Sequence, residues 1–80
     1  MPYIKAARRP TLHKVSGANN AGELNYEITT LVCSYLDAQG MSYGIINEIR
    51  GALLCASDEF YRRVAVPYEN TKLSQNGDVY

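Results

Sequence analysis

The sequence predicts an all-α fold whose centre is an antiparallel helical hairpin, formed by residues of about 23–39 and 42–66. Both segments carry apolar side chains at steps of three and four residues, the spacing that gathers them on one face of a helix. Only Gly40 and Met41 separate the segments, and so short a connection favours antiparallel packing. We expect a short N-terminal helix and extended termini around the hairpin, in a single domain over residues 1–80 that oligomerisation completes.

The part of the chain before the hairpin is expected to lie outside it. Residues 1–9 should form an extended arm, because the opening MPYIK combines a proline with a Tyr-Ile pair that favours extended backbone. Residues 10–16 can form one or two helical turns, since Pro10 is tolerated at the first position of a helix. Residues 17–22 read GANNAG, a run of small and amide residues that is typical of a loop.

The helix over 23–39 has signals at both of its ends. Asn20 and Glu23 have the spacing of a capping box, in which each side chain bonds to the backbone amide of the other residue. Asn25 is an alternative cap. At the other end, Gly40 supplies the residue that most easily adopts the left-handed backbone with which helices commonly end.

The helix over 42–66 is the longest predicted element. Ser42 can cap its start, and Pro67 is expected to stop it, because a proline ring clashes with the preceding turn. Its length would be roughly 37 Å, against ~25 Å for its partner, so a second chain is expected to cover the excess. The expected oligomer interface contains Ile46, Ile49, Leu53 and Phe60. Residues 67–80 are expected to form a polar tail.

The composition limits the classes of function. Eight basic and eight acidic side chains cancel, so no overall field attracts nucleic acid or an anionic membrane. No apolar run approaches the roughly 20 residues that span a bilayer, which predicts no membrane partner and a cytoplasmic location. The seven tyrosines suit protein interfaces, and a chain of 80 residues builds only a marginal core of its own. Together these features indicate self-association.

No arrangement of residues indicates catalysis, a metal or a cofactor. His13 has no nucleophile or acid beside it in a catalytic arrangement. Cys33 and Cys55 fit neither a metal site nor a disulfide framework, and we expect them to be buried free thiols. The motifs for phosphate loops, dinucleotides, zinc and zinc proteases are absent. The expected protein is therefore not an enzyme and uses no metal or cofactor.

A polar cluster near the end of the long helix could bind a ligand or a partner. An arginine pair beside tyrosines can grip a phosphate or stack on a base, and the basic arm could extend the site by folding back. The candidate residues are Tyr61, Arg62, Arg63 and Tyr68, with Arg8 and Arg9 from the arm. The alternatives are a solvated face of ion pairs, since acids stand one turn before both helical arginines, and a subunit interface.

Several blocks of the sequence resemble those of a known family. They are MPYIK at the start, then GELNYEIT, YGIINEI and EFYRRVAVPYE, and NGDVY at the end. In these blocks the chain resembles a family of short uncharacterised proteins found in phages and in bacterial genomes that carry phage-like elements. The resemblance covers nearly the whole chain. It implies a phage context, and it implies no catalytic residue.

The main hypothesis is a small non-enzymatic interaction protein of phage or prophage origin. It would work as a homo-oligomer through protein–protein contacts, with a host or phage protein as a further partner, in the cytoplasm of the host. The alternative is a counter-defence protein that sequesters a nucleotide-type signal at a subunit interface through the arginine and tyrosine cluster. A third hypothesis, which the neutral net charge disfavours, is nucleic-acid binding through the basic arm, with strong salt dependence.

Overall fold

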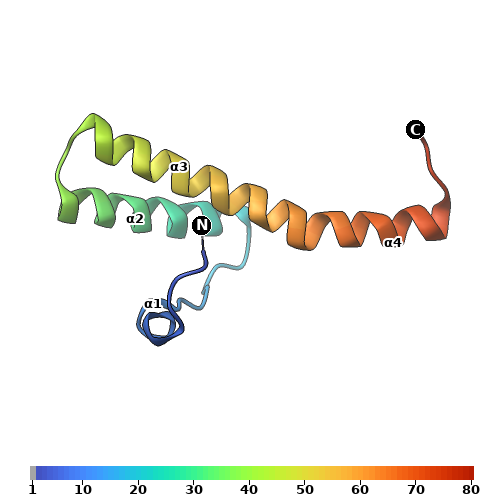
Figure 1. The fold of residues 1–80 in the computed structure, drawn as a ribbon, viewed down its shortest axis with the longest axis horizontal. Coiled ribbons are helices and arrows are strands. Elements are labelled where there is room, and N and C mark those ends of the chain that lie inside the picture. The colour runs from blue at the N-terminus through green and yellow to red at the C-terminus, as the bar shows by residue number, and fades with distance from the viewer. Residues whose placement is uncertain (1) are drawn as a thin grey trace.

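The computed structural model describes residues 2–80, and in these residues it contains helices and no strand (Figure 1). The chain begins with a short 3₁₀-helix, η1, and a single α-helical turn, α1. The hairpin follows as α2 and α3, and a π-helical segment, η2, joins α3 to α4. The bounds are Ala6–Arg8 for η1, Arg9–Leu12 for α1, Ala21–Gln39 for α2, Tyr43–Phe60 for α3, Tyr61–Ala65 for η2 and Val66–Asn76 for α4. The predicted all-α fold with a helical hairpin is confirmed.

The caps of α2 and α3 form as the sequence predicts. Asn20 is the cap of α2, because its Oδ1 accepts a hydrogen bond from the Glu23 amide at 2.9 Å while its Nδ2 donates to the Glu23 carboxylate at 3.2 Å. Gly40 ends the helix with φ at 88°. Ser42 then caps α3, since its hydroxyl accepts a bond from the Ile45 amide at 3.1 Å. Each cap satisfies a backbone amide that the helix itself leaves free.

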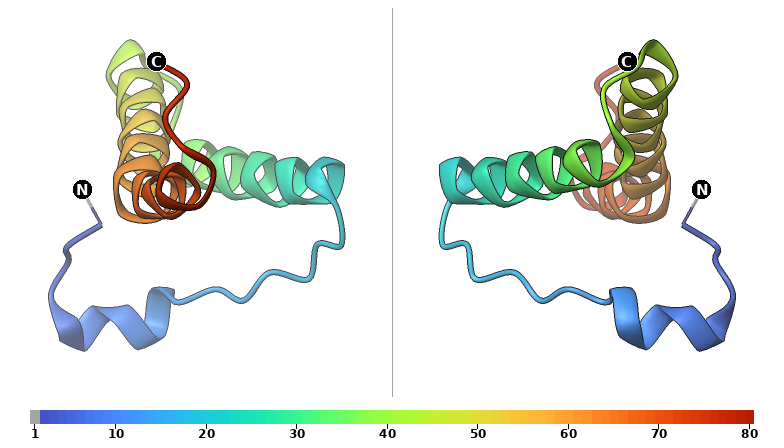
Figure 2. Two further views of the ribbon diagram at one scale, coloured as in Figure 1. Left: turned by 90° about the vertical axis from the view of Figure 1, so that its right-hand side faces the viewer. Right: turned by 90° about the vertical axis from the view of Figure 1, so that its left-hand side faces the viewer.

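The two hairpin helices are splayed and do not lie side by side along their whole length. Figure 2 shows α2 and α3 running in clearly different directions from their shared turn. Near that turn, the Tyr35 hydroxyl of α2 donates a hydrogen bond to the Glu48 carboxylate of α3 at 2.9 Å. The helices therefore meet through a limited part of their apolar faces, and much of each face remains uncovered.

The prediction that Pro67 stops the long helix is wrong. The helix continues through η2 into α4 and ends at Gly77, which has φ at 83°. Proline lacks an amide proton, and in a regular helix its ring would clash with the carbonyl four residues before it. The wider π turn before Pro67, in which the Val66 amide bonds to the Tyr61 carbonyl, places the proline where helical backbone can continue. Residues 67–76 are thus helical and not an extended tail.

Residues 43–76 form one bent rod, and α4 projects from the hairpin into solvent (Figure 1). The bend coincides with η2, as expected for a π-helical turn followed by proline. At 1.5 Å per residue the rod is roughly 50 Å long, which matches the 50 Å longest dimension of the molecule. Among the described elements, α4 contacts η2 and none of the others.

The prediction of an extended arm over residues 1–9 is only partly correct. Residues 2–5 are not helical, whereas 6–12 are helical and 13–20 are not, so the short helix begins earlier than the predicted 10–16. Met1 lies outside the described residues. Helices η1 and α1 contact each other but none of the other described helices. In both figures the middle of this N-terminal segment lies apart from the hairpin.

The described chain has no buried core. None of residues 2–80 is buried, although many large apolar side chains are present. The radius of gyration is 16.4 Å, whereas a compact domain of this length would have about 12 Å. The large apolar residues that are half-buried are Val32, Leu36, Ile45 and Ile49, which lie in the hairpin helices. Any proposed function must therefore account for the exposed apolar surface of the hairpin.

Candidate functional site

An apolar groove runs between α2 and α3, and we call it the hairpin groove. It encloses about 400 Å³. Its lining residues are Leu31, Val32, Tyr35, Glu48, Ile49, Ala52, Leu53 and Ala56. Val32 and Ile49 form its half-buried floor, whereas Leu31 on its wall is 58% exposed. Because the helices splay, these side chains cannot cover one another, and an exposed apolar surface of this kind usually marks a place where another molecule binds.

The polar groups of the hairpin groove are already paired. The hydrogen bond from Tyr35 to Glu48 raises the pKa of the Tyr35 hydroxyl above its usual value, because the carboxylate accepts the bond from the neutral phenol. The Tyr35 hydroxyl would therefore keep its hydrogen-bond acceptor when a molecule fills the groove. The groove is suited to apolar contact.

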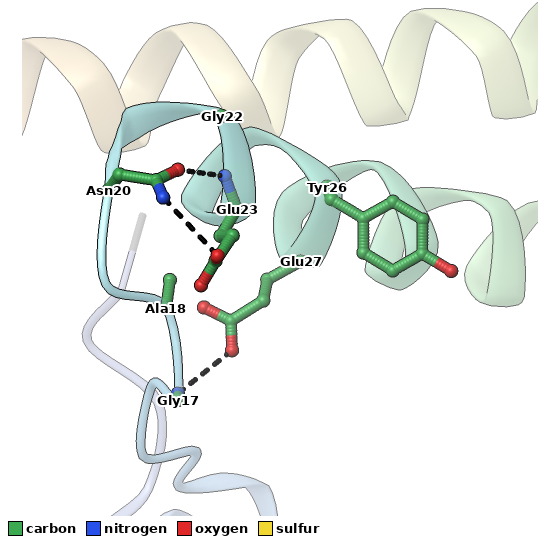
Figure 3. A pocket seen from close by; sticks show the side chains of 7 residues that line it. All are labelled: Gly17, Ala18, Asn20, Gly22, Glu23, Tyr26 and Glu27. Atoms are coloured by element: carbon green, nitrogen blue, oxygen red, sulfur yellow. Dashed lines mark hydrogen bonds between the residues drawn. The ribbon is translucent and has the colours of Figure 1, made fainter.

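A second, shallower hollow lies at the start of α2, where two carboxylates hold the preceding loop (Figure 3). Glu27 accepts bonds from the Ser16 hydroxyl at 2.5 Å and from the Gly17 amide at 3.0 Å. These bonds, that of Ser16 first, hold the pKa of Glu27 below its usual value. One turn earlier, Glu23 accepts a bond from the Asn19 amide at 3.0 Å. Both carboxylates thus fasten the N-terminal segment to α2.

The other end of the N-terminal segment is fastened to α3 at Glu59. The Tyr3 hydroxyl donates a hydrogen bond to Glu59, which also forms an ion pair with Arg62. The bond from Tyr3, followed by the charges of Arg62 and Arg63, lowers the pKa of Glu59. The same bond raises the pKa of Tyr3. The N-terminal segment is therefore attached at two points, Glu59 and Glu27, which lie on different helices of the hairpin.

The predicted arginine and tyrosine cluster does not converge on one site. Tyr61, Arg62 and Arg63 lie in η2, and Tyr68 lies one turn beyond them in α4. Arg62 remains 68% exposed while it pairs with Glu59, and the Tyr61 hydroxyl lies 3.4 Å from a carboxylate oxygen of Glu69. Of the two arginines, Arg62 thus has an acid beside it. The ligand-binding role of these residues stays a prediction.

The arginines of the N-terminal segment are separate from those of η2. Arg8 and Arg9 lie in η1 and α1, which do not contact η2. The guanidinium of Arg9 donates two hydrogen bonds to the Ile4 carbonyl, at 3.1 and 3.2 Å. It therefore stabilises the turn of its own segment.

The predicted interface residues fall in three places. Ile49 and Leu53 line the hairpin groove. Ile46 and Ile49 line a smaller hollow formed with other residues of α2 and α3. Phe60 lies at the end of α3 and is 64% exposed. Sequence reasoning did not assign Leu31 or Tyr35 to a site, and it missed Glu27 as an anchor, because the loop that Glu27 binds is defined only in the folded chain.

The residues considered for catalysis are dispersed. His13 lies in the N-terminal segment, and Cys33 and Cys55 are free and exposed, so the expectation that they are buried is wrong. The splayed hairpin explains this difference, because it has no enclosed core for small side chains. Among residues 2–80, no group of three or more His, Cys, Asp or Glu side chains is placed to hold a metal ion.

Comparison with known proteins places the chain in a family. A family described as a domain of unknown function, DUF6899, matches residues 1–79. The chain belongs to the DUF6899 family. The prediction of an uncharacterised family is confirmed at this level. No curated protein and no solved structure matches this DUF6899 chain significantly. Within the part that the structure describes, no helix combines the length and apolar character that a membrane crossing needs.

Proposed function

We propose that this DUF6899 protein is a small helical interaction protein that works as a homo-oligomer, through protein–protein contacts and without catalysing a reaction. The observation that carries the proposal is the absence of any buried residue among residues 2–80. A chain that buries no side chain gains little from the hydrophobic effect, which is the main favourable contribution to folding. The helices need a further surface to cover them.

The total accessible surface supports this reasoning. The chain exposes 7190 Å², whereas a compact monomer of 8.9 kDa would expose about 4,800 Å². The excess is roughly 2,400 Å² per chain. In obligate oligomers, helices obtain apolar contacts from other subunits, and the interfaces resemble a domain core cut in two. We infer that the helices of this chain cover their excess surface in the same manner.

The chemistry of the exposed surface favours binding over catalysis. The hairpin groove is apolar, and the carboxylates Glu27, Glu48 and Glu59 are each engaged by a hydrogen-bond donor of the chain itself. We extend the proposal to a phage or prophage setting, with a host or phage protein as a further partner in the host cytoplasm. That extension is supported by the blocks MPYIK, EFYRRVAVPYE and NGDVY.

Native mass spectrometry and light scattering test the oligomer directly. We expect a mass of at least two chains of 8.9 kDa each, and hydrogen exchange that is slow in both α2 and α3. A chain that stays monomeric at micromolar concentration, yet has protected amides throughout α3, would contradict the proposal, because the helix would then be stable without a subunit to cover it. Small-angle scattering adds a check, since an isolated chain of this shape has a radius of gyration of 16.4 Å.

A further inference from the structure

We propose that the hairpin groove is filled by the same groove of a second copy, so that two splayed hairpins interlock as a symmetric dimer. This inference rests on the proposed homo-oligomeric function and identifies the surface and the partner. A two-fold symmetric interface uses the same patch on both subunits, so the patch must be complementary to itself. The apolar lining of the hairpin groove meets this condition in chemistry.

The chemistry of the groove is self-complementary because its exposed walls are apolar. Leu31 and Leu53 stand on opposite helices, and the small side chains of Ala52 and Ala56 leave room between them. Large side chains of one copy can therefore pack over the alanines of the other. The polar pair at the edge joins Tyr35 to Glu48 within one copy, so the phenol has its acceptor and the charge of Glu48 remains for a cation of the second copy.

The excess surface of the whole chain, of which the hairpin groove is one part, is sufficient for a stable dimer. If each copy covered only half of its excess surface, the dimer would bury roughly 2,400 Å² in total. Obligate homodimers bury about 2,000–5,000 Å². The excess surface of this chain thus reaches the lower part of that range even when half of it stays exposed.

The N-terminal segment of the same chain does not occupy the groove. It is attached at Glu59 and at Glu27, but η1 and α1 contact neither α2 nor α3. Figure 2 shows the segment crossing from one hairpin helix to the other as an open loop, with its middle away from both. Its own apolar side chains, Leu12 and Val15, are exposed.

Charge complementarity favours a second copy as the occupant. The segment 2–20 carries four basic side chains and no acid, and the segment 21–49 carries four acids and no base. Among residues 2–80 the one ion pair joins Arg62 and Glu59, so these two segments do not neutralise each other within a copy. Lys14 lies beside Leu31 at the wall of the groove. A second copy in the groove would bring its acidic helices next to this basic segment.

Two matched leucines test the proposal. Leu53 lines the hairpin groove and is 41% exposed, whereas Leu73 lies in α4 and is 44% exposed. We expect Leu53→Asp to raise the dimer dissociation constant at least ~100-fold, as for a central interface residue. Leu73→Asp should change it less than about threefold. The measurement is sedimentation equilibrium, with circular dichroism to show that each variant is helical.

A second measurement uses the unaltered chain, because Leu53→Asp could also prevent folding. Copies labelled with ¹⁵N are mixed with unlabelled copies, and a zero-length carbodiimide joins amines to carboxylates that touch. We expect crosslinked pairs of peptides in which one peptide is labelled and the other is not. These pairs should join Lys5 or Lys14 of one copy to Asp37 or Glu48 of the other. If every crosslink to these lysines joined peptides of one label, the proposed arrangement would be wrong.

The outcomes separate this inference from the proposed function. An oligomer that survives Leu53→Asp in folded form would overturn the groove as the interface and leave the homo-oligomeric function standing. A monomeric unaltered protein would overturn both. In that case, slow hydrogen exchange along the groove would show that the N-terminal segment of the same chain closes over it.

Discussion

The hairpin and the projecting helix α4 are both exposed, but for different reasons. Leu53 in α3 and Leu73 in α4 differ by only a few per cent in exposure. Leu53 is surrounded by other apolar side chains of the groove, whereas Leu73 lies among the polar residues Glu69, Asn70, Lys72 and Asn76 of α4, with Val79 and Tyr80 of the C-terminal end beside them. A continuous apolar surface needs a partner, and a single apolar side chain on a polar helix does not. The exposure of one residue therefore says less about an interface than the character of its neighbours.

The largest expected effect comes from a charge in the hairpin. Ile49→Asp places a carboxylate at a half-buried position among the apolar side chains of the groove. We expect the free energy of unfolding to fall by on the order of 2–3 kcal/mol, measured by urea denaturation. Asn70→Asp in α4 is the control and should change the stability by less than about 0.5 kcal/mol. Equal losses of unfolding free energy for the two variants would show that the hairpin and α4 do not differ in their need for a partner.

A smaller effect is expected at the glycines that end α2 and α4. Gly40 has φ at 88° and Gly77 has φ at 83°, a conformation that strains any residue with a Cβ. Gly40→Ala should cost about 1–2 kcal/mol, because the turn that it forms joins the two hairpin helices. Gly77→Ala should cost less, since the end of α4 can fray without loss of tertiary contact. Thermal unfolding of the two variants measures the difference, and a larger loss for Gly77→Ala would mean that α4 is part of the cooperative unit.

The sequence predicted the features that depend on neighbours in the chain. The cap at Asn20, the cap at Ser42 and the turn at Gly40 are all local, so residue type and spacing indicate them, although the Glu23 carboxylate accepts from the Asn19 amide and not from the Asn20 amide of a reciprocal capping box. The prediction for Pro67 was wrong because one π turn before the proline allows the helix to continue, and no residue pattern predicts that turn. The anchors of the N-terminal segment join Tyr3 to Glu59 and Gly17 to Glu27, and such pairs depend on how distant segments are brought together.

Gly51 in α3 offers a test of which side of that helix packs against another subunit. Gly51 does not line the hairpin groove, and a Cβ built on it meets nothing within 4 Å. Gly51→Ala should therefore stabilise the protein by about 1 kcal/mol, the usual gain of alanine over glycine inside a helix. Chemical denaturation at fixed protein concentration measures this gain. A loss of stability together with dissociation would indicate that subunits pack against the Gly51 side instead of the groove.

The smallest expected effects concern the two anchors of the N-terminal segment, which should respond differently to pH. The folded pKa of Glu27 is lowered, so its contribution is present above the unfolded pKa of about 4.3 and is lost as the pH falls through the folded pKa. Glu59 follows the same direction. The folded pKa of Tyr3 is raised, so its contribution is present below the unfolded pKa of about 10 and is lost as the pH rises through the folded pKa.

Acid should therefore release both ends of the segment, and alkali should release only the end at Tyr3. Amide chemical shifts of Gly17 and ring shifts of Tyr3 follow the two ends separately by NMR. In Glu27→Ala the Gly17 amide should lose its acid titration while the Tyr3 ring keeps its alkaline one. If the Gly17 amide instead moved together with the Tyr3 ring at high pH, the two anchors would be one cooperative unit, and the segment would be docked along its length and not only at its two ends.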